Sequence, residues 1–186
     1  GPLHASVSGA HLHEALVHVR TKRTGAWPTP SAYASDATIV LIGMRASGKS
    51  HVGQRLAGLL HRTFLDADEV FAQLHGDLGA YVQSFGWDAF REAEAQILAS
   101  LISQHPTGHV LALGGGVVEY APSRALLEHV REQVGPVVHI VRSYEAISAF
   151  LATSDRPAYG EPLSDVYARR LPLYTRAACM ETVNAS

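Results

Sequence analysis

The chain is 186 residues long, has a formal net charge of −2 and is 47% hydrophobic, which is enough apolar material for the core of one domain. The near-neutral charge argues against a nucleic-acid-binding surface, and no apolar run approaches the roughly 20 residues that span a bilayer. The single Cys179 excludes an internal disulfide and suits a reducing compartment.

Residues 1–36 differ in composition from the rest and are predicted to be an extension and linker. Gly1-Pro2 fits the scar of a cleaved tag. A short helix is expected at residues 11–20, and residues 25–31 are expected to form a linker because they hold two prolines with Gly, Ser and Thr. The basic residues between them are interpreted as a solvated linker face, with an interaction patch as the alternative. The domain proper is predicted to cover residues 37–186.

A glycine-rich motif follows. Residues 43–50, Gly-Met-Arg-Ala-Ser-Gly-Lys-Ser, match the P-loop (Walker A) pattern G-x-x-x-x-G-K-[ST]. An apolar run at 38–42 precedes it and a helical pattern from residue 52 follows, which is the strand-loop-helix setting that the motif requires. The glycines let backbone N–H groups point at a phosphate, and the new helix adds its positive N-terminal end. The nucleotide-binding residues are therefore predicted to be Gly43, Arg45, Ala46, Ser47, Gly48, Lys49, Ser50 and His51.

Strands and helices alternate beyond the P-loop. Strands are predicted at residues 62–66, 109–113 and 137–141, and helices at residues 70–74, 87–103, 123–134 and 145–151. This alternation implies a parallel sheet covered by helices. Ligands in such sheets bind beyond the carboxyl ends of the strands, so the P-loop and the polar residues that follow the other strands are expected to converge on one crevice.

Two groups of charged residues are candidates for chemistry. Asp66 and Asp68 lie two residues apart just past a strand, so one carboxylate can support Mg²⁺ while the other binds or deprotonates a hydroxyl. The alternative is a helix N-cap with acid in the first turn. Arg91 and Glu94 share a helix face, where Glu94 would hold the guanidinium for an anionic substrate; the alternative is a surface ion pair.

Glycines and arginines further along complete the candidates. Gly114, Gly115 and Gly116 follow a predicted strand and offer backbone N–H groups with no side chains in the way. Residues 155–160 suit a mobile loop that lays Arg156 over the nucleotide. The adjacent Arg169 and Arg170 suit recognition of a carboxylate, with local pairing of one and solvation of the other as the alternative.

Taken in order, these motifs resemble the shikimate kinase family, and most of all the shikimate-kinase domain of the fungal pentafunctional arom polypeptide. The resemblance covers about residues 37–180 and rests on G-M-R-A-S-G-K-S, F-L-D-A-D, G-W-D-A-F-R-E-A-E, G-G-G-V-V-E, D-R-P-A-Y-G-E and R-R-L-P-L-Y. It implies a three-layer P-loop fold like that of nucleoside monophosphate kinases, with about five parallel strands. It also implies ATP-dependent phosphorylation of the shikimate 3-hydroxyl by a cytoplasmic, multidomain polypeptide.

The resemblance assigns a role to each matching position. Lys49 and Ser50 would take the ATP phosphates and Mg²⁺, with Asp66 near the metal. Asp68 would bind the shikimate hydroxyls and polarise the attacking one. Arg91 and Arg170 would clamp the shikimate carboxylate, helped by the backbone of Gly114, Gly115 and Gly116. Arg156, in a lid, would cover ATP and act in catalysis by approaching the transferring phosphate.

The chain departs from the family pattern at three points. His51 stands where the family has Thr or Ser, and Leu173 where fungal domains often carry Trp. The last residue, Ser186, falls about where the family's last strand finishes, so the final helix is expected to be missing.

A second hypothesis comes from another class of protein. Fungal quinate-pathway repressors include a shikimate-kinase-like domain, which would bind a ligand or partner in the nucleus without catalysis. The ligand would then be shikimate or quinate. The five residues Lys49, Asp68, Arg91, Arg156 and Arg170 are intact and favour the enzyme.

Overall fold

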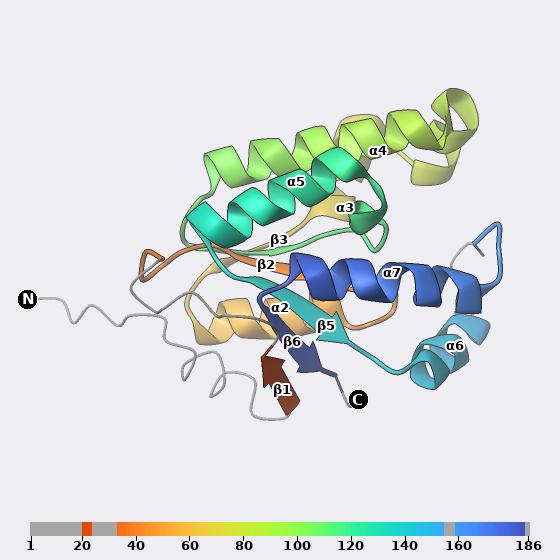
Figure 1. Cartoon of the computed structure of the whole chain (residues 1–186). Coiled ribbons are helices and arrows are strands. Elements are labelled where there is room, and N and C mark those ends of the chain that lie inside the picture. Colours follow the sequence, from red (N-terminus) through yellow and green to blue (C-terminus); the bar gives the residue numbers. More distant parts are fainter. Residues whose placement is uncertain (1–19, 24–32, 155–158, 185–186) are drawn as a thin grey trace, which may run out of the picture.

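The computed structural model describes residues 20–23, 33–154 and 159–184 (Figure 1). In this part of the chain one sheet carries the fold, with its strands in the order β1-β6-β5-β2-β4-β3. Strands β2 to β6 run parallel, and β1 pairs with β6 in the antiparallel direction. The predicted parallel sheet of five strands is confirmed, and a sixth strand extends one edge. The strands are β1 (Arg20–Arg23), β2 (Ile39–Ile42), β3 (Thr63–Asp66), β4 (His109–Ala112), β5 (Val137–Val141) and β6 (Met180–Val183).

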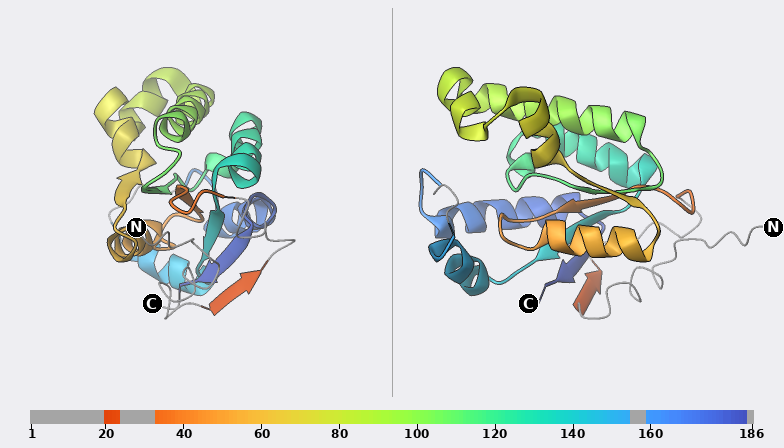
Figure 2. Two further views of the ribbon diagram at one scale, coloured as in Figure 1. Left: turned by 90° about the vertical axis from the view of Figure 1, so that its left-hand side faces the viewer. Right: turned by 180° about the vertical axis from the view of Figure 1, so that it is seen from behind.

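Helices cover both faces of the sheet, as Figures 1 and 2 show. Because side chains alternate along a strand, Ile39 and Leu41 of β2 face α2, while Val40 and Ile42 belong to the core beneath α4, α5 and α7. The result is a three-layer α/β fold. The helices are α2 (Lys49–Leu59), α3 (Ala67–His75), α4 (Leu78–Gln104), α5 (Ala121–His129), α6 (Tyr144–Ala152) and α7 (Leu163–Ala177), with the short 3-10 helix η1 (Val117–Glu119) and the π-helical segment η2 (Val130–Val134).

Two helical segments differ from the sequence-based expectation. The helix predicted at residues 87–103 is the second part of α4, which begins at Leu78 and bends at Gly86, where φ is 84°. Asp77 caps the start of α4 by accepting from the Ala80 N–H at 2.9 Å. No helix was predicted at residues 163–177, which form α7 although Pro172 lies inside it. Packing of Val166 and Tyr174 in the core holds α7 across the proline.

The edge strand β1 lies in the segment that the sequence suggested was an extension and linker. Its register with β6 runs from Arg20 opposite Val183 to Arg23 opposite Met180. Arg20 therefore lies in a strand, whereas the sequence predicted that it ends a helix. The rest of that expected helix and the expected linker at 25–31 lie outside the described residues. No helix in the described ranges is long and apolar enough to cross a membrane.

Candidate active site

The P-loop joins β2 to α2 and has the backbone shape that its sequence demands. Gly43 and Gly48 have φ values of 150° and 90°, and Ala46 has a φ of 65°. A Cβ atom at Gly43 would lie 2.5 Å from the Ile140 carbonyl oxygen, so only glycine fits there. The loop therefore passes directly over the carboxyl end of β5 and leads into the N-terminus of α2, an end of a helix that suits an anion.

Lys49 lies folded over this loop. Its Nζ donates to the carbonyls of Gly43 and Met44, each at 2.8 Å. Two side chains from elsewhere brace the outside of the loop: Arg142 donates to the Ala46 carbonyl at 2.8 Å, and Asn184 donates to the Ser47 carbonyl at 3.0 Å. These contacts occupy carbonyl groups of the loop, and the Ser47 N–H is bonded within the loop to the Met44 carbonyl at 3.1 Å. Neither Arg142 nor Asn184 was singled out from the sequence.

Ser50 and Asp66 form a pair of oxygen ligands beside the loop. Ser50 Oγ donates to Asp66 Oδ2 at 2.7 Å, and Asp66 Oδ1 caps α3 by accepting from the Asp68 N–H at 2.9 Å. Mg²⁺ in phosphate-transfer sites takes only one or two protein oxygens, because phosphates and water supply the rest. Ser50 and Asp66 fit that donor set. The described residues contain no group of three His, Cys, Asp or Glu side chains that would hold a metal alone.

Asp68 and Glu94 meet at the glycine turn after β4. A Cβ atom at Gly114 would lie 2.6 Å from Glu94 Oε1 and 2.9 Å from Asp68 Oδ1, so both carboxylates occupy the space that a side chain would need. Burial raises the pKa of Glu94; the adjacent Arg91 opposes this effect, and the Asp68 carboxylate adds to it. The sequence-based pairing of Arg91 with Glu94 is present, with 2.9 Å between Nη1 and Oε2.

Arg91 lies against the last glycine of this turn. A Cβ atom at Gly116 would be 2.1 Å from Arg91 Nη2. The guanidinium also lies over the rings of Phe90 and Trp87, with its central carbon 5.2 and 5.6 Å from their centroids. Glu94 and these rings hold Arg91 at the glycine turn, where backbone and side-chain donors face the same space.

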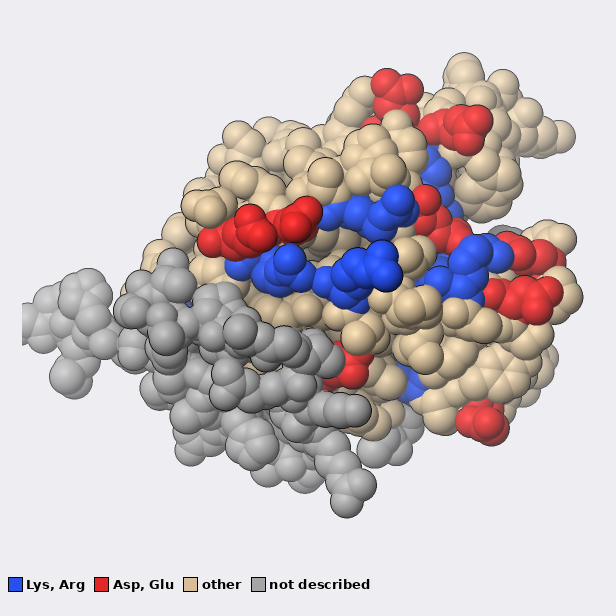
Figure 3. Space-filling model, viewed as in Figure 1, with Lys and Arg blue, Asp and Glu red and all other residues tan. Residues whose placement is uncertain are grey.

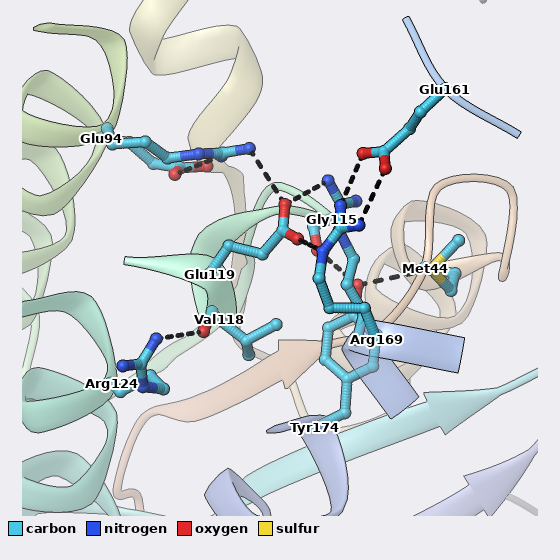
Figure 4. Close-up of polar contacts among 11 residues, drawn as sticks. Met44, Glu94, Gly115, Val118, Glu119, Arg124, Glu161, Arg169 and Tyr174 are labelled. Carbon is cyan, nitrogen blue, oxygen red and sulfur yellow. Dashed lines mark hydrogen bonds and ion pairs between the residues drawn. The ribbon is translucent and has the colours of Figure 1, made fainter. Parts of the chain in front are cut away.

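Arg170 enters the site from α7 and meets Glu119 of η1, the carboxylate labelled beside Arg169 in Figure 4. Arg170 Nη2 donates to Glu119 Oε2 at 2.8 Å, and Arg91 Nη2 lies 3.8 Å from the same oxygen. Arg169 bonds the other oxygen of Glu119 and forms two bonds to Glu161, at 2.6 and 2.8 Å. The two arginines predicted to clamp a carboxylate therefore converge on one carboxylate oxygen.

The charges in this cluster stabilise the ionised carboxylates. Burial acts to raise the pKa of Glu119, but hydrogen bonds from Arg169 and Arg170 outweigh it and hold the pKa below its ordinary value. Burial likewise acts to lower the pKa of Arg170, while the surrounding Tyr174 and Glu119 raise it above the usual value. Glu119 and Arg170 are thus charged at neutral pH. Basic and acidic side chains gather in a band between α5 and α7 on this face (Figure 3).

The glycine turn and the P-loop are neighbours. A Cβ atom at Gly115 would lie 3.0 Å from the Arg45 backbone nitrogen. The Tyr174 hydroxyl donates to the Gly115 carbonyl, and Arg45 lies over the Tyr159 ring at 4.6 Å. The structure thus brings the turn, the P-loop and the arginines together at the carboxyl ends of the strands.

Not every expected site residue can be placed. Arg156 lies outside the described residues. His51 is exposed on α2. Sequence reasoning assigned no role to Glu119, Glu161 or Tyr174. Glu119 had one usable signal, because it ends the motif G-G-G-V-V-E three residues after a turn that was expected to bind an anion.

Comparison with known proteins identifies the family. The Shikimate kinase family model matches residues 45–186. The pentafunctional AROM polypeptide of Malassezia globosa is 64% identical over 187 residues, covering 99% of this chain and 12% of its own length. That of Mycosarcoma maydis is 50% identical, covering 85% of this chain and 9% of its own length. The chain thus spans about a tenth of these relatives.

Solved structures agree with this match. Shikimate kinase from Acinetobacter baumannii, determined in complex with shikimate, has a TM-score of 0.70 and 30% identity and covers 81% of this chain and 83% of its own. Shikimate kinase from Aquifex aeolicus has a TM-score of 0.61 and 27% identity, with 75% and 82% covered. The chain belongs to the shikimate kinase family.

Proposed function

We propose that this domain transfers the γ-phosphoryl group of ATP, with Mg²⁺, to the 3-hydroxyl of shikimate. The observation that carries the proposal is the convergence of Arg91 and Arg170 on one carboxylate oxygen, across the glycine turn from the P-loop. A P-loop alone indicates only a phosphate. The paired arginines add a carboxylate as the second chemical requirement, which a hydroxylated ring acid such as shikimate meets.

The nucleotide half of the site positions phosphates. Lys49 would leave the carbonyls of Gly43 and Met44 and reach the β- and γ-phosphates. Ser50 and Asp66 would hold Mg²⁺, which neutralises charge on the phosphates during transfer. Arg156, three residues before Tyr159 in the sequence, is proposed to cover the nucleotide.

The acceptor half orients the hydroxyl. Asp68 is the proposed partner of the attacking hydroxyl, either accepting its proton or polarising it. The buried Glu94, paired to Arg91 at 2.9 Å, keeps that guanidinium aimed at the glycine turn. The backbone N–H groups of Gly114, Gly115 and Gly116 are proposed to add donors to the substrate carboxylate.

The wider setting of the domain is also a proposal. The relatives are multidomain polypeptides, so we propose that this domain works beside other domains in the cytoplasm. Their name supports the enzyme over a non-catalytic domain of a quinate-pathway repressor. Quinate remains the competing ligand to be tested.

A coupled assay of ADP release with shikimate or quinate tests the proposal. Lys49→Ala is expected to abolish nucleotide binding. Arg91→Ala and Arg170→Ala are each expected to raise KM for shikimate about tenfold to a hundredfold, because one charge-assisted hydrogen bond is worth roughly 1.5–3 kcal/mol. Arg55→Ala, which removes an exposed arginine of α2, is the matched control and should leave KM unchanged. Shikimate binding without any ADP release from folded protein would instead favour the regulatory hypothesis.

A further inference from the structure

Glu119 lies where an incoming carboxylate would bind. Its Oε2 is 2.8 Å from Arg170 Nη2 and 3.8 Å from Arg91 Nη2, so it bridges the two arginines of the proposed clamp. Its other oxygen, Oε1, bonds Arg169, which also pairs with Glu161. Figure 4 shows the Glu119 carboxylate pointing into this group of guanidiniums.

The charges of the cluster are already matched by the chain itself. Within the described ranges, the guanidiniums of Arg91, Arg169 and Arg170 pair with three carboxylates, those of Glu94, Glu119 and Glu161. The Asp68 carboxylate lies beside Glu94, so a bound substrate would bring a fifth carboxylate. Like charges that share a partly buried site destabilise one another, so one of the internal carboxylates has to give way.

Glu119 is the carboxylate best placed to yield. Glu94 is buried on α4 and pairs with Nη1 of Arg91, whereas Glu119 lies near Nη2. Glu161 is exposed, and among the described residues its ion pair is with Arg169. Among the carboxylates of the described residues, Glu119 is the one with ion pairs to both clamp arginines, and its bond to the half-exposed Arg169 gives it a partner to keep when it turns away. Arg170 Nε is buried and has no hydrogen-bond partner among the described residues, which leaves it a donor to spare for a ligand.

We propose that Glu119 is an internal carboxylate that occupies the arginine clamp and is displaced to Arg169 by the carboxylate of the substrate. This inference rests on the proposed function of Arg91 and Arg170. Glu119 then acts as a specificity-determining residue. A ligand that bonds both arginines and the glycine turn replaces Glu119. A ligand with fewer of these bonds does not compensate for the lost ion pair between Glu119 and the clamp arginines.

Glu119→Gln tests the displacement directly, because glutamine keeps the shape and removes the charge. Two ring ligands separate carboxylate recognition from hydroxyl recognition: cyclohexanecarboxylate and its neutral amide. Fluorescence of Trp87, which lies against Arg91, reports binding in a background where Trp27→Phe leaves one tryptophan. The variant is expected to bind cyclohexanecarboxylate and shikimate on the order of tenfold more tightly, and the amide no better.

Glu161→Gln is the matched control, since it removes one carboxylate of the same cluster that does not touch Arg91 or Arg170. It is expected to change the affinity for either acid less than twofold or so. Equal tightening in both variants would show a general charge effect and overturn the proposal. Unchanged or weaker binding in Glu119→Gln would also overturn it, because Glu119 would then be positioning Arg170.

Arg169 supplies a second and independent test. Arg169→Gln removes the partner to which Glu119 is displaced, so the proposal expects weaker shikimate binding although Arg169 is not in the clamp. The double variant Glu119→Gln/Arg169→Gln is expected to bind as tightly as Glu119→Gln alone. If the double variant binds as weakly as Arg169→Gln, then Arg169 acts on the ligand directly and the displacement is wrong.

The two proposals fail in different ways. Absence of shikimate-dependent ADP release from the wild-type domain would defeat the proposed function but leave the cyclohexanecarboxylate measurement valid. Tighter binding of that acid by Glu119→Gln would then still support displacement of Glu119. Normal catalysis with no difference between the two glutamine variants would defeat only the displacement.

Discussion

The side chains around the turn after β4 explain why glycine occupies its positions. The Cβ position of Gly114 is taken by Glu94 and Asp68, and that of Gly116 by Arg91. Gly116 has a φ of −92°, so its backbone would accept any residue. What excludes other residues is the charged side chains that reach the turn. The glycine triplet therefore serves side-chain access as much as backbone donation.

Gly116→Ala isolates this effect. The added methyl group would lie 2.1 Å from Arg91 Nη2, the far end of a flexible side chain, so Arg91 would move and the fold would tolerate the change. We expect KM for shikimate to rise about tenfold, with the free energy of unfolding changed by less than about 1 kcal/mol. Steady-state kinetics and urea unfolding measure the two quantities. Gly58→Ala, whose Cβ would meet nothing within 4 Å, controls for the methyl group and should leave KM unchanged.

His139 predicts how stability depends on pH. Burial lowers its pKa from the ordinary 6.5, and the bond to Glu181 at 3.1 Å only partly offsets this. As the pH falls below 6.5, the unfolded chain binds the proton first, so stability is present above that pH and is lost below it.

We therefore expect the wild type to lose stability between pH 7.5 and 5.5, and His139→Gln to lose less per pH unit. The difference in slope is at most about 1.4 kcal/mol per pH unit, the effect of one proton. Urea unfolding across this range gives the slopes, and His51→Gln controls for the loss of one histidine. Parallel slopes in the wild type and His139→Gln would contradict the assignment.

Among the elements, α7 supports the acceptor half of the site. Arg170 and Tyr174 lie four residues apart and so share one face of the helix, which is turned toward the glycine turn. Tyr174 is fully buried, donates to the Gly115 carbonyl and stacks on His139 at 4.9 Å. The helix thus positions a clamp arginine and the turn below it as one unit.

Tyr174→Phe should loosen that unit. Removal of the hydroxyl leaves the Gly115 carbonyl without its donor, which costs about 1–3 kcal/mol of unfolding free energy. We expect KM for shikimate to rise severalfold while KM for ATP changes less. Tyr167→Phe is the matched control, because it removes a hydroxyl of the same helix that donates instead to the Arg142 carbonyl at 3.2 Å. If Tyr167→Phe raised KM for shikimate equally, positioning by Tyr174 would lose its support.

At the scale of the whole molecule, β1 determines where the sheet ends. Without it, β6 would present its backbone groups at an edge, and an unpaired edge invites pairing with another chain. The N–H groups of successive residues in β1 point alternately toward β6 and away from it. Proline therefore distinguishes the two directions, since it removes one N–H group.

Thr21→Pro and Lys22→Pro test this pairing as each other's control. One of the two should lower the free energy of unfolding by roughly 1 kcal/mol or more, through a lost ladder hydrogen bond, and the other should be close to neutral. Thermal and urea unfolding measure the difference. Two neutral variants would mean that β1 contributes nothing to the sheet.

The sequence predicted those elements whose own residues show the pattern of a strand or a helix. The strand at 137–141 matches β5 residue for residue, because a run of β-branched residues fits a buried parallel strand. α7 escaped prediction because Pro172 breaks the local helical pattern and the core packing of Tyr174 compensates for it. β1 escaped because Arg-Thr-Lys-Arg carries no apolar alternation, and only its partner β6 makes it a strand.

By itself, the sequence determined the family, the P-loop and the parallel sheet, since these depend on spacings within a few residues of the chain. It also named Arg91 and Arg170 as a pair for one carboxylate. Only the tertiary structure decided which groups share that space, because Arg91, Glu119 and Arg170 come from three segments that the fold brings together. Glu119 lies between the two arginines because of how the fold places these three segments at the carboxyl ends of the strands, and no local pattern of residues encodes that placement.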